Sequence, residues 1–568
     1  MLFEVSALAL AVVVACLLRS TWTPLLRLER MFRELSKRHL LVVAIPGILA
    51  ISGRLMLLPI SPVPVPGVHD EFSYLLAADT FAHGRMANPP NPMWIHFETF
   101  HELQQPSYAS MYPVGQGLFL AFGELLGSPW IGVLLSVALM CSVITWMLCG
   151  CFPVHWALVG GLFAVCRFAL FSYWIDSYWG GAVAALGGAL VFGSVIRLRA
   201  TLSSVKRAMG LMCSLTIGLL LLANTRPFEG LMFSVPVLIV LLHRLVNVTP
   251  QWPAKRLLRA ALPSFATAVI AVSLMGIYFT RVTGSPVMMP YQLHQQQYST
   301  TQPFIWQPML PEPKYRHIVF RNYYDPQAAY YRQAHTLAGW AHETLLKSVS
   351  IVMFYLWPMG LIILLMFRSL WRMDRVFRLA IWTAIALFAG LSLEIWPMML
   401  HYAAPFASVA MLISVAALRS VRRVTWKGKQ VGVYVSWAFP LLCVGMLTLR
   451  AGAATLRIGV PDQGMLPWFT VRQGNIQRLT VEHRLEQIPG KHLVVVRYGS
   501  KHDPSNEWVY NPAVIESAKV VWAREMTPAE DARLIHYFSD RDVWLLEPDK
   551  KPLHLVPYNS LSLSSSAR

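Results

Sequence analysis

Residues 128–147 read SPWIGVLLSVALMCSVITWM, a run of twenty residues without a charged side chain. As a helix, a run of this length crosses the hydrocarbon core of a bilayer. Similar runs recur along the 568 residues of the chain, of which 55% are hydrophobic and 14% are charged, with a mean hydropathy of +0.47. A soluble protein carries about 25% charged residues. The composition therefore predicts an all-α polytopic membrane protein.

The apolar runs predict about twelve transmembrane helices. A further helical piece at 114–126 is expected to pack on the third span. The predicted spans are 4–18, 39–59, 128–147, 154–174, 179–196, 208–223, 228–245, 259–279, 347–367, 376–393, 398–418 and 431–449.

Basic residues cluster in alternate loops between these spans, and the positive-inside rule places those loops in the cytoplasm. The opposite loops then face the outer side, and they carry few lysines or arginines near the spans. This bias accounts for most of the formal net charge of +19, so we expect contact with anionic membrane lipids and no nucleic-acid partner. The outer segments are 60–113, 174–178, 224–230, 281–346, 393–397 and the tail from about 451.

The chain divides into two parts. Residues 1–450 form the membrane core, which the outer loops 60–113 and 281–346 interrupt. Residues 455–568 alternate strand-like runs with helix-like ones, which predicts a small C-terminal extracytoplasmic α/β domain with a partly parallel sheet. Its strands are expected at 492–498, 518–524 and 542–547, with a helix at 528–538.

Two adjacent carboxylates, Asp70 and Glu71, follow the second apolar run in the stretch PVPGVHDEFSYLLAADTFAHGR. Acids beside a membrane surface are costly unless they meet solvent, a cation or a substrate. Partial burial there would raise a carboxylate pKa toward the working pH, which suits a general base. The pair is therefore a candidate for a catalytic base with a substrate or cation ligand beside it. The alternative is a solvated turn or a helix N-terminus, where acids suit the helix dipole.

A second outer acid, Asp176, lies in the short loop WIDSYW at 174–179. Together with Asp70 it could hold a divalent cation such as Mg²⁺ or Mn²⁺, or it could orient an acceptor. Such a cation is the one cofactor that the sequence leaves open. The alternative is a capping residue between two helices.

The outer-loop run NTRPFEG holds Arg226, one of few cations on the outer side near the membrane. Its guanidinium could bind a lipid phosphate through two hydrogen bonds, or it could pair with Glu229 in a tight turn. Glu394, His401 and Tyr402 lie at the outer end of a later span. His401 could bond a phosphate or a sugar hydroxyl, although a histidine at a helix end is often only a satisfied polar residue.

The outer loop 281–346 is rich in Gln, Pro and Tyr. Aromatic rings and amides suit sugar or peptide binding, because rings stack on apolar C–H faces and amides bond hydroxyls. The same composition suits an aromatic belt at the lipid headgroups. The sequence leaves both interpretations open.

Taken in order, these motifs resemble those of the GT-C glycosyltransferases over roughly residues 40–420. They are the acidic pair, the run YPVGQG at 112–117 that enters the next span, a second outer acid, an outer arginine and a His-Tyr-x-x-Pro run. The nearest pattern is that of bacterial enzymes akin to protein O-mannosyltransferases and aminoarabinose transferases. Here the acidic pair follows the second apolar run instead of the first, and His401-Tyr402 stands where many relatives have Arg-Tyr.

The resemblance implies an inverting transferase that moves a sugar from a polyprenyl-phosphate-linked donor to a lipid, glycan or protein acceptor. It implies a site at the outer face of a bacterial inner (plasma) membrane. Catalytic roles are implied for Asp70, Glu71 and Asp176, with Asp70 as the general base. The implied donor-phosphate ligands are Arg226, His401 and Tyr402, and the implied substrate-binding residues are Tyr112, Gln116, Tyr178 and Glu394.

Two other functions fit a polytopic chain. A transporter, or a flippase for lipid-linked sugars without transferase activity, predicts charged residues in mid-span and broken helices in matched halves. Arg54 and Arg167 lie within spans, but no paired halves and no GxxxxGK[ST] run are seen. A non-catalytic scaffold leaves the outer charges without a shared purpose. The transferase requires one outer cavity, opening laterally to lipid, around Asp70, Glu71, Asp176 and Arg226.

Overall fold

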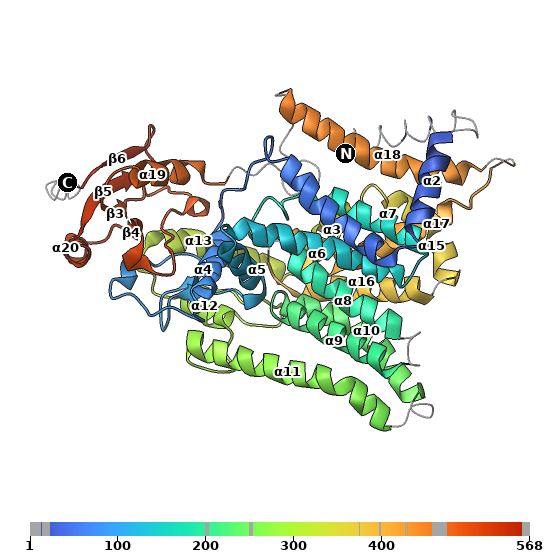
Figure 1. The fold of residues 1–568 in the computed structure, drawn as a ribbon. Coiled ribbons are helices and arrows are strands. Elements are labelled where there is room, and N and C mark those ends of the chain that lie inside the picture. The colour runs from blue at the N-terminus through green and yellow to red at the C-terminus, as the bar shows by residue number, and fades with distance from the viewer. Residues whose placement is uncertain are drawn as a thin grey trace.

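The computed structural model shows a helical bundle with a small mixed sheet at one end (Figure 1). Apolar helices form the bundle, and their facing sides share one large buried cluster of hydrophobic side chains. The residues that the structure describes are 23–198, 204–248, 254–373, 375–396, 399–426, 430–456 and 474–558, together with 9, 13 and 428.

Seventeen described helices and one short hairpin precede the C-terminal domain. The hairpin pairs β1 (Glu102–Leu103) with β2 (Ala109–Ser110) in antiparallel fashion. The helices are α2 (Thr23–Leu35), α3 (His39–Met56), α4 (His69–Ala82), α5 (Val114–Leu125), α6 (Pro129–Cys149), α7 (Val154–Ala164), α8 (Ala182–Leu198), α9 (Val205–Ala223), α10 (Pro227–Val248), α11 (Ala254–Thr283), α12 (Pro290–Tyr298), α13 (Ile318–Ala334), α14 (Leu337–Tyr355), α15 (Gly360–Met373), α16 (Arg375–Leu393), α17 (Phe406–Val421) and α18 (Val431–Thr455).

Fewer helices reach spanning length than the twelve predicted spans, so that count is not confirmed. Apolar helices of 10–17 residues, in α5, α7, α8, α10 and α17, account for four other predicted spans and for the extra piece at 114–126. The predicted span 4–18 lies, apart from residues 9 and 13, outside the described residues. Within the part of the chain that is described, six helices are long and apolar enough to cross a membrane: His39–Met56, Pro129–Cys149, Val205–Ala223, Leu258–Thr283, Arg375–Leu393 and Val431–Ala453.

The predicted span at 347–367 is wrong as a single helix, because α14 and α15 divide it and meet at 95°. Pro358 lies in the break, and a proline lacks an N–H donor and disfavours helical backbone in the residue before it. The buried Arg167 guanidinium donates to the main-chain carbonyls of Met353, Phe354 and Trp357 there. The unpaired carbonyls of a helix end therefore satisfy a charge that lies within the bundle.

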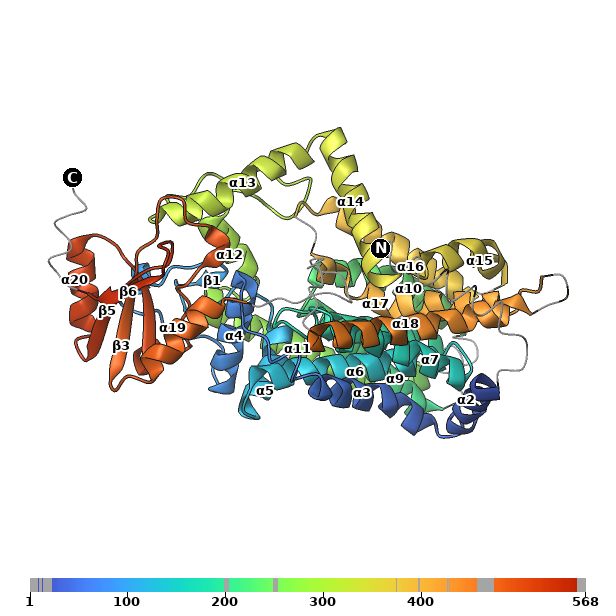
Figure 2. The same cartoon turned by 90° about the horizontal axis from the view of Figure 1, so that it is seen from above.

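The helices of the predicted outer loops gather at one end of the bundle. Helices α4, α12 and α13 gather with the C-terminal domain at one end, on the left in Figure 1, whereas the α8–α9, α10–α11 and α17–α18 junctions lie at the other end. The loop predicted at 281–346 contains α12, α13 and the first turns of α14. Figure 2 shows α13 and α14 meeting at an elbow. The outer loops are therefore structured, and the elements that carry the predicted outer residues lie together.

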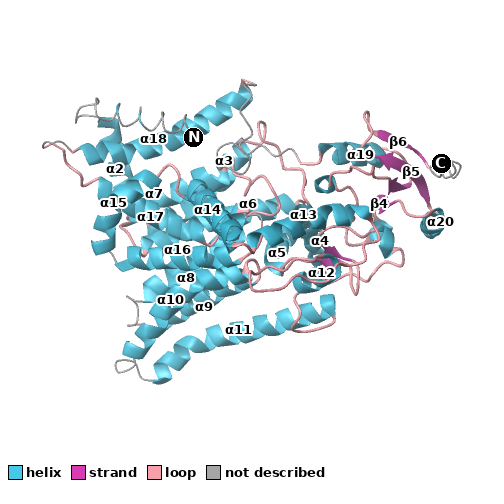
Figure 3. Ribbon diagram, turned by 180° about the vertical axis from the view of Figure 1, so that it is seen from behind, coloured by secondary structure: helices cyan, strands magenta, loops and turns pink. Residues whose placement is uncertain are grey.

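The C-terminal domain confirms the strands predicted for the tail. Its sheet has the order β4–β3–β5–β6, with β3 parallel to β4 and β5 and with β6 antiparallel to β5 (Figure 3). Five of the six residues of β3 are buried, as expected for a central parallel strand. The elements are α19 (Ile476–Glu486), β3 (Lys491–Val496), β4 (Val520–Arg524), α20 (Pro528–Tyr537), β5 (Arg541–Glu547) and β6 (His554–Pro557).

The C-terminal domain packs against the first large outer loop. Leu76, Phe97 and Tyr108 of that loop share a buried cluster with Leu493 and Leu534 of the domain. Burial of apolar side chains on both sides holds the two segments together. The domain therefore supports the same loop that carries the acidic pair.

Candidate functional site

The start of α4 places Asp70 and explains the role of its neighbour Glu71. Glu71 Oε2 accepts the main-chain N–H groups of Gly67 at 2.8 Å and Val68 at 3.2 Å, in the manner of a capping box. Its Oε1 accepts the N–H of Tyr178 at 3.1 Å. Glu71 therefore ties the start of α4 to the loop at 174–179. Because successive helical residues project about 100° apart, Asp70 points in a different direction.

Asp70 meets two side chains from the loop that follows α4. His101 Nδ1 lies 2.9 Å from Asp70 Oδ1, and the Tyr112 hydroxyl donates to the same oxygen. Burial alone would raise the pKa of Asp70, but His101 and the Tyr112 hydroxyl hold that pKa below its ordinary value. Burial raises the pKa of Tyr112 well above its ordinary value, so its hydroxyl stays a donor. Asp70 is therefore an ionised carboxylate at the outer end of the bundle.

His101 is a site residue that the sequence analysis misses. Its φ of +63° lies in the left-handed region, which is uncommon for residues other than glycine. Its carbonyl accepts the Ser73 hydroxyl at 2.6 Å and the Met111 N–H at 3.1 Å, and these bonds hold the backbone in place. Its Nε2 lies 3.1 Å from the Tyr323 hydroxyl of α13. The sequence places a histidine in the same outer loop as Asp70, but no spacing indicates their contact.

Tyr74 lies within electrostatic reach of both Asp70 and Arg226. It lies one helical turn after Asp70 and stacks on Tyr112, with ring centroids 4.4 Å apart and planes inclined by 20°. Burial raises the pKa of Tyr74 to about 12, while Arg226 lowers that pKa and Asp70 raises it. Tyr112 also lies within the electrostatic field of Arg226. Asp70 and Arg226 therefore belong to one cluster, which we call the outer cluster: Asp70, Tyr74, His101, Tyr112, Arg226 and Tyr402.

Arg226 contacts a carboxylate and an aromatic ring. Its Nη1 lies 4.0 Å from Glu229 Oε1, and its guanidinium carbon lies 4.4 Å from the centroid of the Tyr402 ring. Stacking on a ring face leaves the N–H edge of the planar guanidinium available to an acceptor with two oxygens, such as a phosphate. His401, next to Tyr402, is buried, with its Nδ1 3.3 Å from the Tyr173 hydroxyl. His401 thus forms part of the aromatic wall behind Arg226.

Gln116 and Tyr178 brace the loops around the acidic pair. Gln116 Nε2 donates to the carbonyl of Tyr178 at 2.8 Å. The Tyr178 hydroxyl donates to the carbonyl of Pro64 at 3.1 Å. These bonds hold the loop at 174–179 against α5 and against the residues that precede α4. Both residues therefore hold the loops around the site in place through hydrogen bonds to main-chain carbonyls.

Asp176 pairs with an arginine of the bundle, apart from the outer cluster. Its Oδ1 lies 2.6 Å from Arg54 Nη2, and both side chains of this ion pair are buried. Arg54 also donates to the carbonyls of Ser61 and Pro62, so the guanidinium holds the exit of α3. Burial raises the pKa of Asp176 to about 6, and Arg54 opposes that rise. The contacts of Asp176 are those of a structural residue.

The predicted cation site does not fit these contacts. Asp70 is bonded to His101 and Tyr112, and Asp176 is bonded to Arg54. Among the described residues, no group of three or more His, Cys, Asp or Glu side chains is placed to hold a metal ion. The two carboxylates therefore serve separate parts of the molecule.

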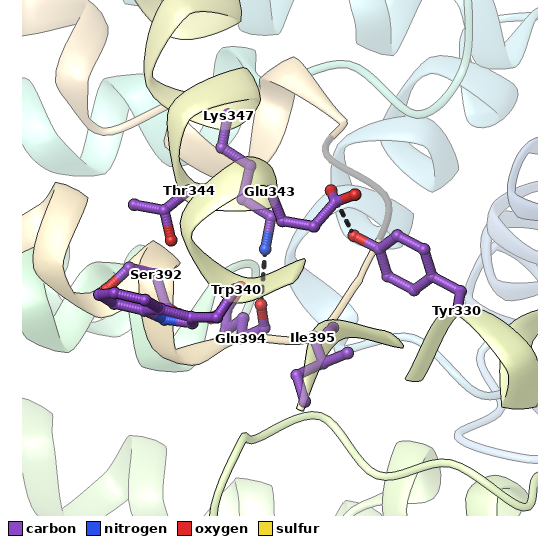
Figure 4. Close-up of a pocket in the computed structure, with 9 residues that line it drawn as sticks. Tyr330, Trp340, Glu343, Thr344, Lys347, Ser392, Glu394 and Ile395 are labelled. Atoms are coloured by element: carbon purple, nitrogen blue, oxygen red, sulfur yellow. Dashed lines mark hydrogen bonds between the residues drawn. The ribbon is translucent and has the colours of Figure 1, made fainter. Parts of the chain in front are cut away.

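Glu394 borders a pocket between α14 and the end of α16 (Figure 4). Lys347 Nζ donates to the main-chain carbonyl of Glu394 at 2.5 Å. Burial raises the pKa of Glu394 well above its ordinary value, Glu229 raises that pKa further, and Lys347 and Arg226 lower it. Glu394, which lines the pocket, thus interacts electrostatically with both Glu229 and Arg226. The other residues that line the pocket are Tyr330, Ala334, Trp340, Glu343, Thr344, Ser392 and Ile395.

The C-terminal domain reaches the residue next to Asp70. His69 Nδ1 lies 2.8 Å from the Tyr510 hydroxyl, and the Tyr510 ring stacks on Phe72 with centroids 4.1 Å apart. Burial, with a contribution from His101, lowers the pKa of His69 to about 3, so its imidazole is neutral at physiological pH. The first turn of α4 is therefore clamped between the bundle and the C-terminal domain.

The comparisons with known proteins give structural likenesses only. No family model and no curated protein sequence matches the chain. The chain is similar to crystal structures of ArnT from Cupriavidus metallidurans in the apo state (TM-score 0.48, 15% identity) and bound to undecaprenyl phosphate (TM-score 0.46, 16% identity), and each likeness covers 89% of this chain and 92% of that one. It is also similar to an Archaeoglobus fulgidus oligosaccharyltransferase in complex with Zn and sulfate (TM-score 0.45, 11% identity, 89% of this chain and 67% of that one).

One of these neighbours is an oligosaccharyltransferase by name, and the sequence motifs resemble those of glycosyltransferases. All of these TM-scores are below 0.5. What this chain does is therefore inferred from the residues of the outer cluster.

Proposed function

We propose that this protein is an inverting membrane glycosyltransferase that moves a sugar from a polyprenyl-phosphate-linked donor to an acceptor at the outer face of the membrane. The observation that supports this most is the placement of an ionised carboxylate, Asp70, and a cation, Arg226, in one aromatic cluster. Transfer from a lipid phosphate needs a base for the acceptor and a positive charge for the leaving phosphate. The outer cluster supplies both.

The proposed chemistry follows from these two charges. Base catalysis centred on Asp70 removes the proton of the acceptor hydroxyl while its oxygen attacks the anomeric carbon. The attack comes from the face opposite the phosphate, so the configuration is inverted. The bond between the anomeric carbon and the phosphate oxygen breaks, and both electrons leave with that oxygen. Arg226, oriented by its stacking on Tyr402, stabilises the charge on the phosphate.

The surroundings of the cluster support a lipid-linked substrate. Six helices of spanning length among the described residues supply the bilayer setting, and the cluster lies at one end of the bundle. His69 and Tyr74 of α4 and Tyr323 of α13 lie beside Asp70 or its partner His101, and aromatic rings can stack on the apolar faces of a sugar. We place the site and the C-terminal domain outside a bacterial inner (plasma) membrane, with a lipid, glycan or protein as acceptor.

The transporter and flippase alternative loses its main support. A transporter needs charged residues in mid-span that bind its substrate, and Arg54 and Arg167 are the candidates in the sequence. Arg54 is paired with Asp176 at 2.6 Å, and Arg167 donates to main-chain carbonyls at the break between α14 and α15. Both charges thus have structural partners.

The test is a transfer assay in membranes that contain the protein. Undecaprenyl-phosphate-linked pentoses and hexoses with a radioactive sugar are supplied as donors, and label that moves from donor to membrane lipid, glycan or protein is measured. We expect transfer from at least one donor by the wild type, and a loss of about 10²–10⁴-fold in Asp70→Asn, the range of general base catalysis. Thermal unfolding in detergent shows whether the variant is folded. No transfer from any donor by the wild type would contradict the proposal.

A further inference from the structure

We infer that Asp70 and His101 act as a dyad, in which Nε2 of His101 takes the proton of the acceptor hydroxyl and Asp70 orients and stabilises the imidazole. The inference rests on the proposed glycosyl transfer and adds to it the identity of the atom that accepts the proton. It assigns a catalytic role to a residue that no motif in the sequence singles out.

The hydrogen bonds of His101 distinguish its two ring nitrogens. Nδ1 lies 2.9 Å from Asp70 Oδ1, so the tautomer with its proton on Nδ1 donates to the carboxylate. Nε2 then carries a lone pair, and the Tyr323 hydroxyl lies 3.1 Å from it. The Tyr323 hydroxyl oxygen therefore occupies the position from which an attacking hydroxyl would give its proton to Nε2. With an acceptor hydroxyl in place of Tyr323, this becomes the arrangement of a nucleophile, a base and an orienting carboxylate.

The backbone of His101 is held in the left-handed region, which is uncommon for residues other than glycine. Its φ is +63°, and its carbonyl is fixed by the Ser73 hydroxyl at 2.6 Å and by the Met111 N–H at 3.1 Å. Ser73 lies on α4, one turn after His69, so the helix that carries Asp70 also holds the backbone of His101. Strained backbone of this kind persists where surrounding structure over-determines it and gathers at functional sites. The strain here aims the imidazole at Asp70.

The contacts of Asp70 favour the imidazole as the proton acceptor. Two donors, Tyr112 and His101, converge on Asp70 Oδ1 and hold the pKa of that carboxyl below its ordinary value. The carboxylate oxygen that would have to accept the proton thus already accepts two hydrogen bonds, whereas Nε2 of His101 faces a hydroxyl. The groups that face His101 are Asp70, Tyr112, Tyr323 and the rings of His69 and His294, whose centroids lie 5.5 Å and 6.0 Å from its own.

The proton and the electrons balance in this step. The acceptor hydroxyl takes the position of the Tyr323 hydroxyl and gives its proton to Nε2. Its oxygen forms the new bond to the anomeric carbon as the bond to the phosphate oxygen breaks. The imidazolium that results is paired with the Asp70 carboxylate, as in a serine-protease triad. It returns its proton to water before the next turnover.

The experiment is chemical rescue in the membrane transfer assay. Glycine suits a φ of +63° and leaves a space of imidazole size, so His101→Gly removes the ring with little demand on the backbone. We expect a loss of transfer of about 10²–10⁴-fold, and added imidazole should restore about tenfold or more with a pH dependence set by the free imidazole. Asp70→Asn should not respond to imidazole.

A matched control exists at the C-terminal end of α4, the helix that carries Asp70. His83 Nδ1 lies 2.9 Å from Asp79 Oδ1, a histidine–aspartate contact outside the outer cluster, and the His83 side chain is 53% exposed. His83→Gly should transfer sugar at the wild-type rate with or without imidazole. This separates rescue at the site from a general effect of imidazole on the membranes.

Two outcomes overturn the inference while the proposed function stands. One is a His101→Gly rate within about threefold of the wild type, far from a base-catalysis deficit, which leaves Asp70 as the direct base. The other is a folded His101→Gly that loses transfer and is not restored by imidazole, which makes His101 a structural support. If His101→Gly does not fold, His101→Asn replaces it, because asparagine tolerates left-handed backbone. Retained transfer then overturns the inference, and lost transfer at an unchanged donor KM supports it. Failure of the wild type on every donor contradicts the proposed function itself.

Discussion

Asp70 and Asp176 look alike in the sequence, because both are acids beside aromatic residues in predicted outer loops, but the fold gives them opposite surroundings. Asp176 is paired with Arg54, and the two side chains are 8% and 0% exposed. The Asp70 side chain is 21% exposed and meets an imidazole and a phenol. An acid paired with a buried arginine serves structure, whereas an acid beside a titratable ring can take part in proton transfer.

The largest effect should come from breaking the Asp176 pair. Arg54→Met leaves a buried carboxylate without its guanidinium, which costs about 3–5 kcal/mol in comparable pairs. We expect a marked fall in the free energy of unfolding, measured with denaturant in detergent. The double variant Arg54→Met/Asp176→Leu should recover most of it, because an apolar pair avoids the buried charge. Asp70→Asn should show the reverse pattern, with transfer lost and stability nearly kept. If Arg54→Met were as stable as the wild type, the structural role inferred for the Asp176 pair would be contradicted.

The next largest effect concerns the cation on the Asp70 side. Arg226→Gln keeps the size of the side chain but removes its charge. Charge-assisted hydrogen bonds are worth about 1.5–3 kcal/mol, so kcat/KM for the donor should fall about 10- to 100-fold. Arg321→Gln is the matched control, because Arg321 is an outer arginine whose side chain is 54% exposed and pairs with Glu312 at 2.7 Å. Equal losses in the two variants would contradict phosphate binding by Arg226.

A pH effect of intermediate size should arise at His69, beside Asp70. Burial lowers the pKa of His69 from 6.5 to about 3, so the folded protein holds a neutral ring that the unfolded chain protonates below pH 6.5. The free energy of unfolding should therefore fall as pH drops from 6.5 toward 3, by up to about 1.4 kcal/mol per pH unit from this group. His69→Asn keeps an acceptor for Tyr510 and does not titrate. Unfolding at pH 7.5 and 5.5 should show a smaller acid loss in the variant, and parallel losses would refute the assignment.

The smallest effect should appear at the contact between the C-terminal domain and α4. Tyr510→Phe removes the hydroxyl that lies 2.8 Å from His69 and keeps the ring that stacks on Phe72. One hydrogen bond is worth about 1 kcal/mol, and the free energy of unfolding should fall by about that amount. Tyr537→Phe is the control, because its hydroxyl meets Glu516 on the exposed surface at 3.2 Å. A change in Tyr510→Phe no larger than in the control would show that the clamp on α4 is not needed for stability.

The sequence predicts the helical architecture well where apolar runs are long and uninterrupted. The spans at 128–147, 376–393 and 431–449 correspond to α6, α16 and α18, because hydropathy alone decides a helix in lipid. It fails at 347–367, where Pro358 lies in a break within a mostly apolar run. It also treats 281–346 as a loop, although α12 and α13 form there from polar and aromatic residues whose burial depends on neighbours.

The candidate site is only partly predictable for a related reason. Asp70 and Arg226 stand out, because isolated charges beside a membrane are costly. Glu71 and Asp176 stand out equally. In the structure, however, Glu71 accepts hydrogen bonds from main-chain N–H groups, and Asp176 pairs with Arg54. Composition cannot separate these cases, since the partner of each charge comes from another part of the chain.

The sequence by itself determined a helical membrane core and a small sheet in the tail, because hydropathy and strand periodicity are local properties. Only the tertiary structure decided which acid meets which partner. Asp176 and Arg54 are 122 residues apart, and His101 and Tyr323 are 222 residues apart, in the chain. Contacts of that range depend on how helices pack, and packing follows from the summed burial of many side chains.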